Sequence, residues 1–191
     1  MSDPRALFLD VAANMSRVAD SAYVNAITRA VDMLDDAFRT GHKLLVFGNG
    51  GSSADAQHLT AELVGRFATE RRALPAIALT TNQAVLTAWS NDHSFEDVFA
   101  RQVEALGVSG DVAWAISTSG TSANVVTAMR RARELGLRTI GLTGESGGAI
   151  AAFSDVLLAV PLTDTARIQE VHLVTYHAIC AALEDRMVRR A

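Results

Sequence analysis

Short apolar runs and helix-spaced apolar residues alternate along the chain. Runs of four or five consecutive apolar residues are typical of strands buried on both faces of a parallel sheet. Five such strands are predicted, at about residues 43–47, 76–79, 112–116, 138–142 and 156–160. The intervening segments repeat their apolar residues with the helical period of about 3.6 residues. This alternation predicts an α/β fold: a three-layer sandwich with a five-stranded parallel, flavodoxin-like sheet.

Helices are expected to precede, connect and follow the strands. The longest covers residues 166–188, and another covers residues 95–106. A third is expected to end near Trp89, which leaves Asn91 and Asp92 in a break where a surface turn is the simplest interpretation. The glycine-rich residues 144–148 also predict a turn.

Residues 5–39 predict two further helices, ahead of the first strand. Apolar residues recur at helical spacing in both, and Gly41 is placed to end the second. Their apolar faces must be covered, either by the sheet or by helices of a neighbouring subunit. No composition shift divides the chain. We therefore expect one domain over residues 1–191, with residues 1–40 serving oligomerisation and residues 41–191 forming the α/β core.

Composition narrows the functional classes. The 191 residues include 17 basic and 21 acidic ones, for a net charge of −4, and no long basic run is present. This charge argues against direct binding to nucleic acid or to an acidic membrane surface. The lone cysteine, Cys180, excludes an intrachain disulfide. Neither a signal peptide nor a membrane-spanning segment is visible, so a cytoplasmic protein is expected.

Two predicted strands end in glycine- and hydroxyl-rich loops that open helices. The first loop runs from Gly48 to Ser53, and the second from Ser117 to Ser122. Glycine lets the backbone bring free N–H groups close to an anion. Ser52 or Ser53 is expected to cap the helix after the first loop. Neither a P-loop nor a dinucleotide fingerprint is complete, so the loops predict a phosphoryl group that stays on its substrate.

His58 and Glu62 stand at i and i+4 in the helix after the first loop, so both side chains project from one face. The pair could bind a metal, relay protons or simply occupy a solvated face. Gln169 and His177 suit the same chemistry but lie about 12 Å apart along the last helix. One metal between them would need side chains converging from both ends, or a neighbouring subunit. His172 is expected to be a packing residue or to support a metal ligand.

The four most specific stretches are GNGGSSADAQHLTAELVGRF, SNDHSFEDVFARQVEALGVSGDV, AISTSGTSANV and RIQEVHLVTYH. Together they resemble the phosphoheptose isomerases, which belong to the sugar isomerase (SIS) domain family. The resemblance implies an isomerase that interconverts D-sedoheptulose 7-phosphate and D-glycero-D-manno-heptose 7-phosphate. It also implies a homotetramer with active sites between subunits, one Zn²⁺ per subunit, and a role in making heptose precursors for bacterial surface glycans.

The same resemblance implies roles for individual residues. The zinc ligands of the family fall on His58, Glu62, Gln169 and His177. Glu62 would also be the base that acts on carbon, and His177 the acid that serves the oxygens. Substrate contacts, besides Glu62 and Gln169, fall on Asn49, Gly50, Gly51, Ser52, Asn91, Asp92, Ser117, Thr118, Ser119 and Ser122.

Other functions fit the same motifs. A related SIS-domain protein binds the bacterial replication initiator, and we expect it to lack the groups that Glu62 and His177 supply here. A sensor of sugar phosphates would need the serine loops but neither of these residues. An isomerase for a different sugar phosphate is also compatible, because the loops report the phosphate and say little about the length of the sugar.

Overall fold

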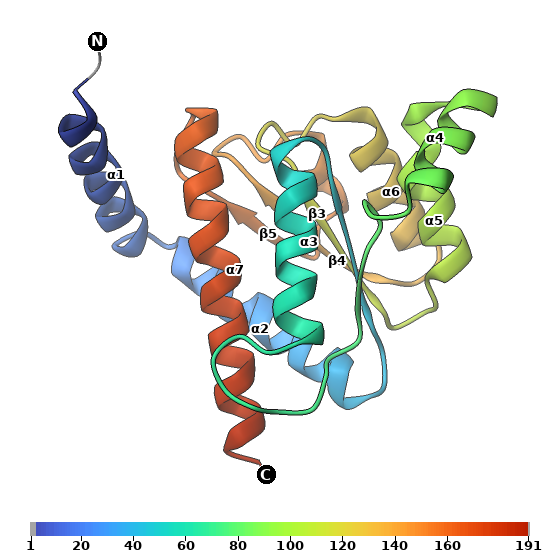
Figure 1. The fold of residues 1–191 in the computed structure, drawn as a ribbon, viewed down its shortest axis with the longest axis horizontal. Coiled ribbons are helices and arrows are strands. Elements are labelled where there is room, and N and C mark those ends of the chain that lie inside the picture. Colours follow the sequence, from blue (N-terminus) through green and yellow to red (C-terminus); the bar gives the residue numbers. More distant parts are fainter. Residues whose placement is uncertain (1–2, 191) are drawn as a thin grey trace.

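The computed structural model describes residues 3–190, which form three layers with the sheet between two sets of helices (Figure 1). Five parallel strands pair in the order β2-β1-β3-β4-β5. Their bounds are β1 Leu44–Gly48, β2 Ala76–Ala78, β3 Val112–Ile116, β4 Arg138–Thr143 and β5 Val156–Ala159. This order is flavodoxin-like, so the predicted architecture is confirmed.

Helices precede, connect and follow the strands. They are α1 Pro4–Ala19, α2 Tyr23–Arg39, α3 Gly51–Val64, α4 Gln83–Asp92, α5 Val98–Leu106, α6 Ala123–Glu134 and α7 Thr165–Val188, with short 3₁₀ helices η1 Phe95–Asp97 and η2 Ala149–Phe153. Within residues 3–190, none of these helices combines the length and the apolar character needed to cross a membrane.

Each face of the sheet has its own apolar core. The larger core packs α2, α3 and α7 on one face, and the smaller packs α5 and α6 on the other. Along β1, Leu44 and Val46 join the larger core while Leu45 and Phe47 join the smaller one. This is the alternation of a strand, and covering both faces explains why the strands read as continuous apolar runs.

The helices α3 and α7 lie side by side and run in the same direction (Figure 1). Their starts meet where a Cβ on Gly51 would lie 2.7 Å from the amide nitrogen of Gln169. Beyond the end of α3, the backbone N–H of Phe67 donates to Glu184 of α7 at 2.7 Å. Residues far apart in the sequence therefore face each other along the whole length of this helix pair.

The two N-terminal helices differ in how they are covered. α2 packs against the sheet face and α7, where the Tyr23 hydroxyl lies 2.7 Å from that of Thr175. α1 projects from the body of the molecule (Figure 1), and Val18 is its only buried residue. Leu7, Phe8 and Leu9 are 50, 76 and 61% exposed. The sheet thus covers α2, whereas α1 leaves these apolar side chains uncovered, and a subunit contact through α1 stays a prediction.

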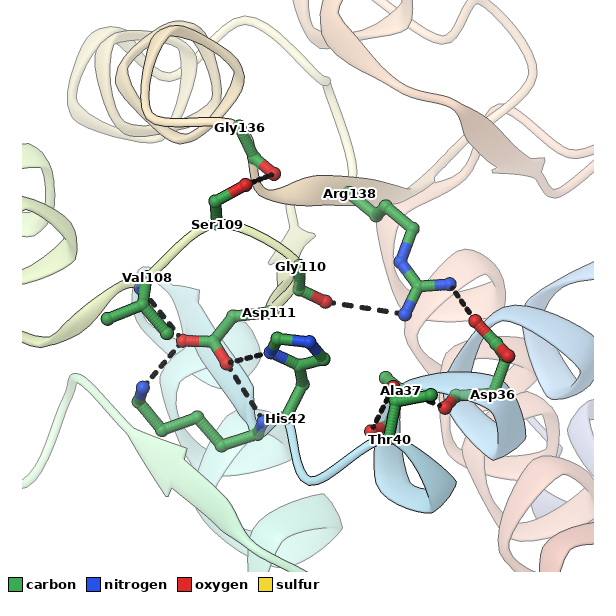
Figure 2. A network of polar contacts seen from close by, with 11 residues as sticks. Asp36, Ala37, Thr40, His42, Val108, Ser109, Gly110, Asp111, Gly136 and Arg138 are labelled. Carbon is green, nitrogen blue, oxygen red and sulfur yellow. Dashed lines mark hydrogen bonds and ion pairs between the residues drawn. The ribbon is translucent and has the colours of Figure 1, made fainter.

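At the amino ends of the strands, on the side of the sheet away from the two glycine-rich loops, a buried carboxylate joins several segments (Figure 2). Asp111, directly before β3, accepts hydrogen bonds from the backbone N–H groups of Lys43 and Val108 and from the Lys43 ammonium. His42 lies 3.5 Å from the same carboxylate. Burial alone would raise the pKa of Asp111, but these donors together hold it below its usual value. His42 is therefore part of a structural network.

One predicted boundary is wrong. α4 does not end near Trp89 but continues to Asp92, so Asn91 and Asp92 belong to its last turn. The Asn82 side chain caps the start of α4 by accepting a hydrogen bond from the Val85 N–H at 3.1 Å. At the other end, the His93 N–H bonds to the Trp89 carbonyl at 2.9 Å and the two rings stack with centroids 3.9 Å apart. That stacking extends the helix by a turn that residue preference alone would not favour.

Candidate active site

The two glycine- and hydroxyl-rich loops leave the sheet side by side, because β1 and β3 are neighbouring parallel strands. Asn49 lies in the first loop, and Asn124 lies in the first turn of α6, just after the second. Their side-chain amides exchange two hydrogen bonds, with N···O distances of 2.8 and 2.9 Å. Asn124 is buried. The two hydrogen bonds of this amide pair thus connect the first loop to the start of α6, directly after the second loop.

The start of α3 lies at the end of the first loop. Gly50 occupies the N-cap position with φ +55°, a conformation that favours glycine. No side chain caps this helix, so the predicted cap by Ser52 or Ser53 is wrong. The chain already turns at Gly50, and both serines lie inside the first helical turn. The first N–H groups of such a helix lack intrahelical partners, so this end suits an anion.

Serine hydroxyls converge in the second loop. Ser117 Oγ lies 3.5 Å from Ser119 Oγ and 3.4 Å from Ser122 Oγ. Gly120 has φ +65°, and a Cβ there would collide with the Gly147 carbonyl oxygen in the turn at residues 144–148. That turn therefore buttresses the second loop. Thr118, with Ser119 and the start of α7, lines an adjoining hollow of about 550 Å³.

Below the first loop, His58 and Glu62 of α3 meet His177 of α7. His58 Nε2 lies 3.1 Å from Glu62 Oε1 and 3.4 Å from His177 Nε2. One ligand atom from each residue lies within 4.8 Å of the others, so the three could hold a metal ion. Ligand atoms around tetrahedral zinc, bound at about 2.0–2.1 Å, lie about 3.3 Å apart. The two short separations match that value, and the imidazole and carboxylate donors suit zinc.

Two residues that the sequence analysis did not single out lie behind this cluster. The Tyr176 hydroxyl is 3.0 Å from His58 Nδ1 and 3.4 Å from Asp55 Oδ1. Burial raises the pKa of the Asp55 carboxyl. Burial, and next the nearby Asp55 charge, raise the pKa of Tyr176, so the phenol keeps its proton. The pKa of His177 is lowered, first by burial and then by the neighbouring His58.

Gln169 and His172, which also lie on α7, do not belong to this cluster. Gln169 lies against Gly51, at the first loop, and about 12 Å of helix rise separates it from His177. Within this chain, the structure therefore groups His58, Glu62 and His177 and places Gln169 beside the first loop. His172 is fully buried with Nε2 3.2 Å from the Thr143 carbonyl oxygen, which agrees with the expected packing role.

Asn91 and Asp92 lie on α4, whose Leu86 and Trp89 pack against the smaller core. α4 is thus on the opposite side of the sheet from α3 and α7. Both polar residues are exposed, and the Asn91 amide donates to Asp92 at 2.8 Å. A contact between these residues and a sugar stays a prediction.

A buried ion pair holds the segment that follows Glu62. Glu184 of α7 accepts hydrogen bonds from three successive backbone N–H groups, at residues 67–69, and its Oε1 lies 3.1 Å from Arg71 Nε. Arg71 in turn donates to the Glu62 carbonyl at 2.6 Å. Burial would raise the pKa of Glu184, but these N–H groups and Arg71 together hold it below its usual value. The pair therefore fixes the C-terminal end of α3.

Comparison with known proteins gives a consistent result. The SIS domain family model matches residues 8–144. A phosphoheptose isomerase of Synechocystis sp. is 52% identical over 174 residues, which cover 91% of this chain and 90% of the relative. One of Geotalea daltonii is 58% identical over 161 residues, 84% of each chain. The solved phosphoheptose isomerase of Neisseria gonorrhoeae has a TM-score of 0.89 and 42% identity over 95% of this chain and 96% of that one. The Francisella tularensis structure has a TM-score of 0.90 and 38% identity over the same shares.

The parallel sheet, and the loops that open helices at its carboxyl edge, are those of a SIS-domain protein. The relatives narrow this class further. The chain belongs to the phosphoheptose isomerase family and is an isomerase.

Proposed function

We propose that this chain interconverts D-sedoheptulose 7-phosphate and D-glycero-D-manno-heptose 7-phosphate, with zinc as its cofactor. The observation that carries the proposal is the cluster of His58, Glu62 and His177, placed directly after a loop that suits a phosphate. An aldose–ketose isomerase must move one proton between adjacent carbons and others between their oxygens. The cluster offers both a carboxylate and an imidazole for that work.

Glu62 is the base in this proposal. Its Oε1 lies beside His58 Nε2, so Oε2 is the oxygen that would take the proton from the carbon next to the carbonyl, giving an enediol. His177 would pass protons between the two sugar oxygens. Burial and the neighbouring His58 lower the pKa of His177, which favours the neutral imidazole that a metal ligand must be. Because Nε2 faces His58 in the proposed metal cluster, Nδ1 would be the nitrogen that handles the transferred proton.

His58, Glu62 and His177 would hold the zinc, which supplies polarisation of the sugar oxygens when bound. A homotetramer with sites between subunits would let Gln169 of a neighbouring subunit complete the set, because Gln169 of the same protomer lies at the loop edge. The uncovered apolar residues of α1 support such an assembly. We propose a cytoplasmic enzyme with one zinc per subunit.

The phosphate would lie at the carboxyl edge of β1 and β3. At the start of α3, the phosphate would meet the backbone N–H groups of Gly50, Gly51 and Ser52. In the second loop, it would meet the hydroxyl groups of Ser117, Thr118, Ser119 and Ser122. Asn49 would orient the sugar from the same edge. Asn91 and Asp92, in the last turn of α4, would also contact the sugar.

A coupled assay on sedoheptulose 7-phosphate tests this function, with metal content measured on the same sample. We expect turnover that a chelator abolishes, that added Zn²⁺ restores, and that accompanies about one zinc per chain. Turnover in metal-free protein would support the proposed roles of the glutamate and the histidine and would contradict zinc as the cofactor. Absence of turnover in zinc-loaded protein would contradict the proposed substrate, and other sugar phosphates would be tested next.

A further inference from the structure

The Tyr176 hydroxyl lies between two residues of α3. Asp55 and His58 are one helical turn apart and both face α7, where Tyr176 is fully buried. The hydroxyl is within hydrogen-bond reach of His58 Nδ1 at 3.0 Å and of Asp55 Oδ1 at 3.4 Å. It carries a single hydrogen, so it can donate to only one of these partners at a time.

Two arrangements of the hydrogens satisfy these contacts. In the first, Tyr176 donates to His58 Nδ1, and His58 carries its own hydrogen on Nε2, which points at Glu62 Oε1 3.1 Å away. In the second, His58 Nδ1–H donates to the Tyr176 oxygen, and Tyr176 donates to Asp55. Only the second leaves a free lone pair on Nε2, facing Glu62 and His177.

We propose that Asp55 and Tyr176 are positioning residues that hold His58 in its Nδ1–H tautomer and thereby open its Nε2 to a divalent cation. The inference rests on the metal site of the proposed function and adds two residues to it. Asp55 supplies the acceptor that draws the hydroxyl hydrogen away from His58. Without that carboxylate, the Tyr176 hydrogen goes to Nδ1 and the blocked tautomer is favoured. Residues that orient a metal-bound histidine in this way commonly change metal affinity by about 10–100-fold.

Zinc titration of metal-free protein tests the inference by calorimetry, without reference to turnover. We expect Tyr176→Phe to raise the Kd for Zn²⁺ by about 10-fold or more, because the Nδ1–H of His58 loses its acceptor. Asp55→Ala should raise it to a similar extent. Asp55→Asn should bind more tightly than Asp55→Ala, because its amide oxygen still accepts from Tyr176. The double variant Asp55→Ala/Tyr176→Phe should be no weaker than Tyr176→Phe alone, since both act through one chain of hydrogen bonds.

Tyr23→Phe is the matched control. Tyr23 is also buried, and its hydroxyl bonds to Thr175, the residue directly before Tyr176. Its removal costs the same kind of hydrogen bond but touches neither His58 nor Asp55. The Kd for zinc should therefore stay at the wild-type value.

A measurement on the wild-type chain needs no substitution. In zinc-loaded protein with ¹⁵N-labelled histidine, the Nδ1–H of His58 should exchange slowly with solvent, because Tyr176 covers it. Exchange as fast as at the exposed His93 would overturn the inference, as would an unchanged Kd in Tyr176→Phe when the wild type binds zinc. Failure of the wild type to bind zinc would instead overturn the proposed metal site, and the inference with it.

Discussion

Asn49 and Asn124 face each other across the two loops and satisfy each other's amides, at 2.8 and 2.9 Å. Asn124 also accepts a hydrogen bond from the backbone N–H of Val125, so it is fixed to the start of α6. The pair sets the spacing between the loop after β1 and the loop after β3. A ligand that contacts both loops would depend on this spacing, although Asn124 itself need not touch it.

The first prediction concerns this amide pair. Asn124→Leu keeps the side-chain size but leaves the Asn49 amide without its partner, which costs about 1–3 kcal/mol. We expect lower stability in urea and a KM for sugar phosphate raised roughly 10-fold, with a smaller change in kcat. Asn25→Leu, on the exposed surface of α2, is the control and should change neither quantity. An unaltered KM for Asn124→Leu would show that the spacing does not matter to the ligand.

The second prediction concerns the reacting groups. Glu62→Gln and His177→Ala should each lower kcat by about 10²–10⁴-fold, the usual worth of a general acid or base, while the protein stays folded and oligomeric. Rates and far-UV circular dichroism are measured on the same samples. Glu70→Gln removes a carboxylate that is 88% exposed and should leave kcat unchanged. A near-normal rate in either site variant would contradict the proposed mechanism.

The third prediction concerns the buried pair of Arg71 and Glu184, whose side chains are each 3% exposed. Glu184→Gln leaves Arg71 buried without its counter-charge and should lower the free energy of unfolding by about 3–5 kcal/mol. Arg71→Met should cost a similar amount. The double variant should cost clearly less than the sum, because it leaves no unpaired charge. Additive losses in urea denaturation would show that the two groups do not act as a pair.

The fourth prediction is a pH dependence. Burial lowers the pKa of His172 from its ordinary 6.5 to about 4, despite the bond to the Thr143 carbonyl. Below pH 6.5, His172 binds a proton in the unfolded chain but stays neutral in the folded chain. The free energy of unfolding therefore falls as the pH drops towards 4. At about pH 5 the loss is about 2 kcal/mol relative to about pH 7. His172→Gln should lack this part of the loss when urea denaturation is compared at the two pH values. An equal loss of stability in the wild type and in His172→Gln would show that His172 is not the source of this pH dependence.

Much of the fold could be predicted because its signals are local. Continuous apolar runs identified all five strands, and their alternation with helices identified the layers. The spacing of His58 and Glu62 placed both on one face of α3, where the structure finds them together with His177. The errors fell where a local preference competes with a contact. The stacking of Trp89 on His93 extended α4, and the turn at Gly50 displaced the expected serine cap.

The supporting residues of the site could not be found in the sequence. Tyr176 reads there as one more core residue of the last helix, and only the packing of α7 on α3 brings it to His58. Asn124 reads as a polar residue near a helix start, with nothing to indicate Asn49 as its partner. Glu184 reads as surface charge, although it accepts three backbone hydrogen bonds. Each of these roles depends on a contact between distant segments, which periodicity cannot reveal.

The unequal burial of the helices has a consequence for hydrogen exchange. α4 buries none of its residues, whereas β1 and β3 are buried along their whole length. Amide protons of α4 should therefore exchange through local opening, and those of the two strands only through global unfolding. Asn91 and Asp92 lie on that readily opened helix. If they contact the sugar as proposed, substrate should slow exchange in α4 far more than in the sheet.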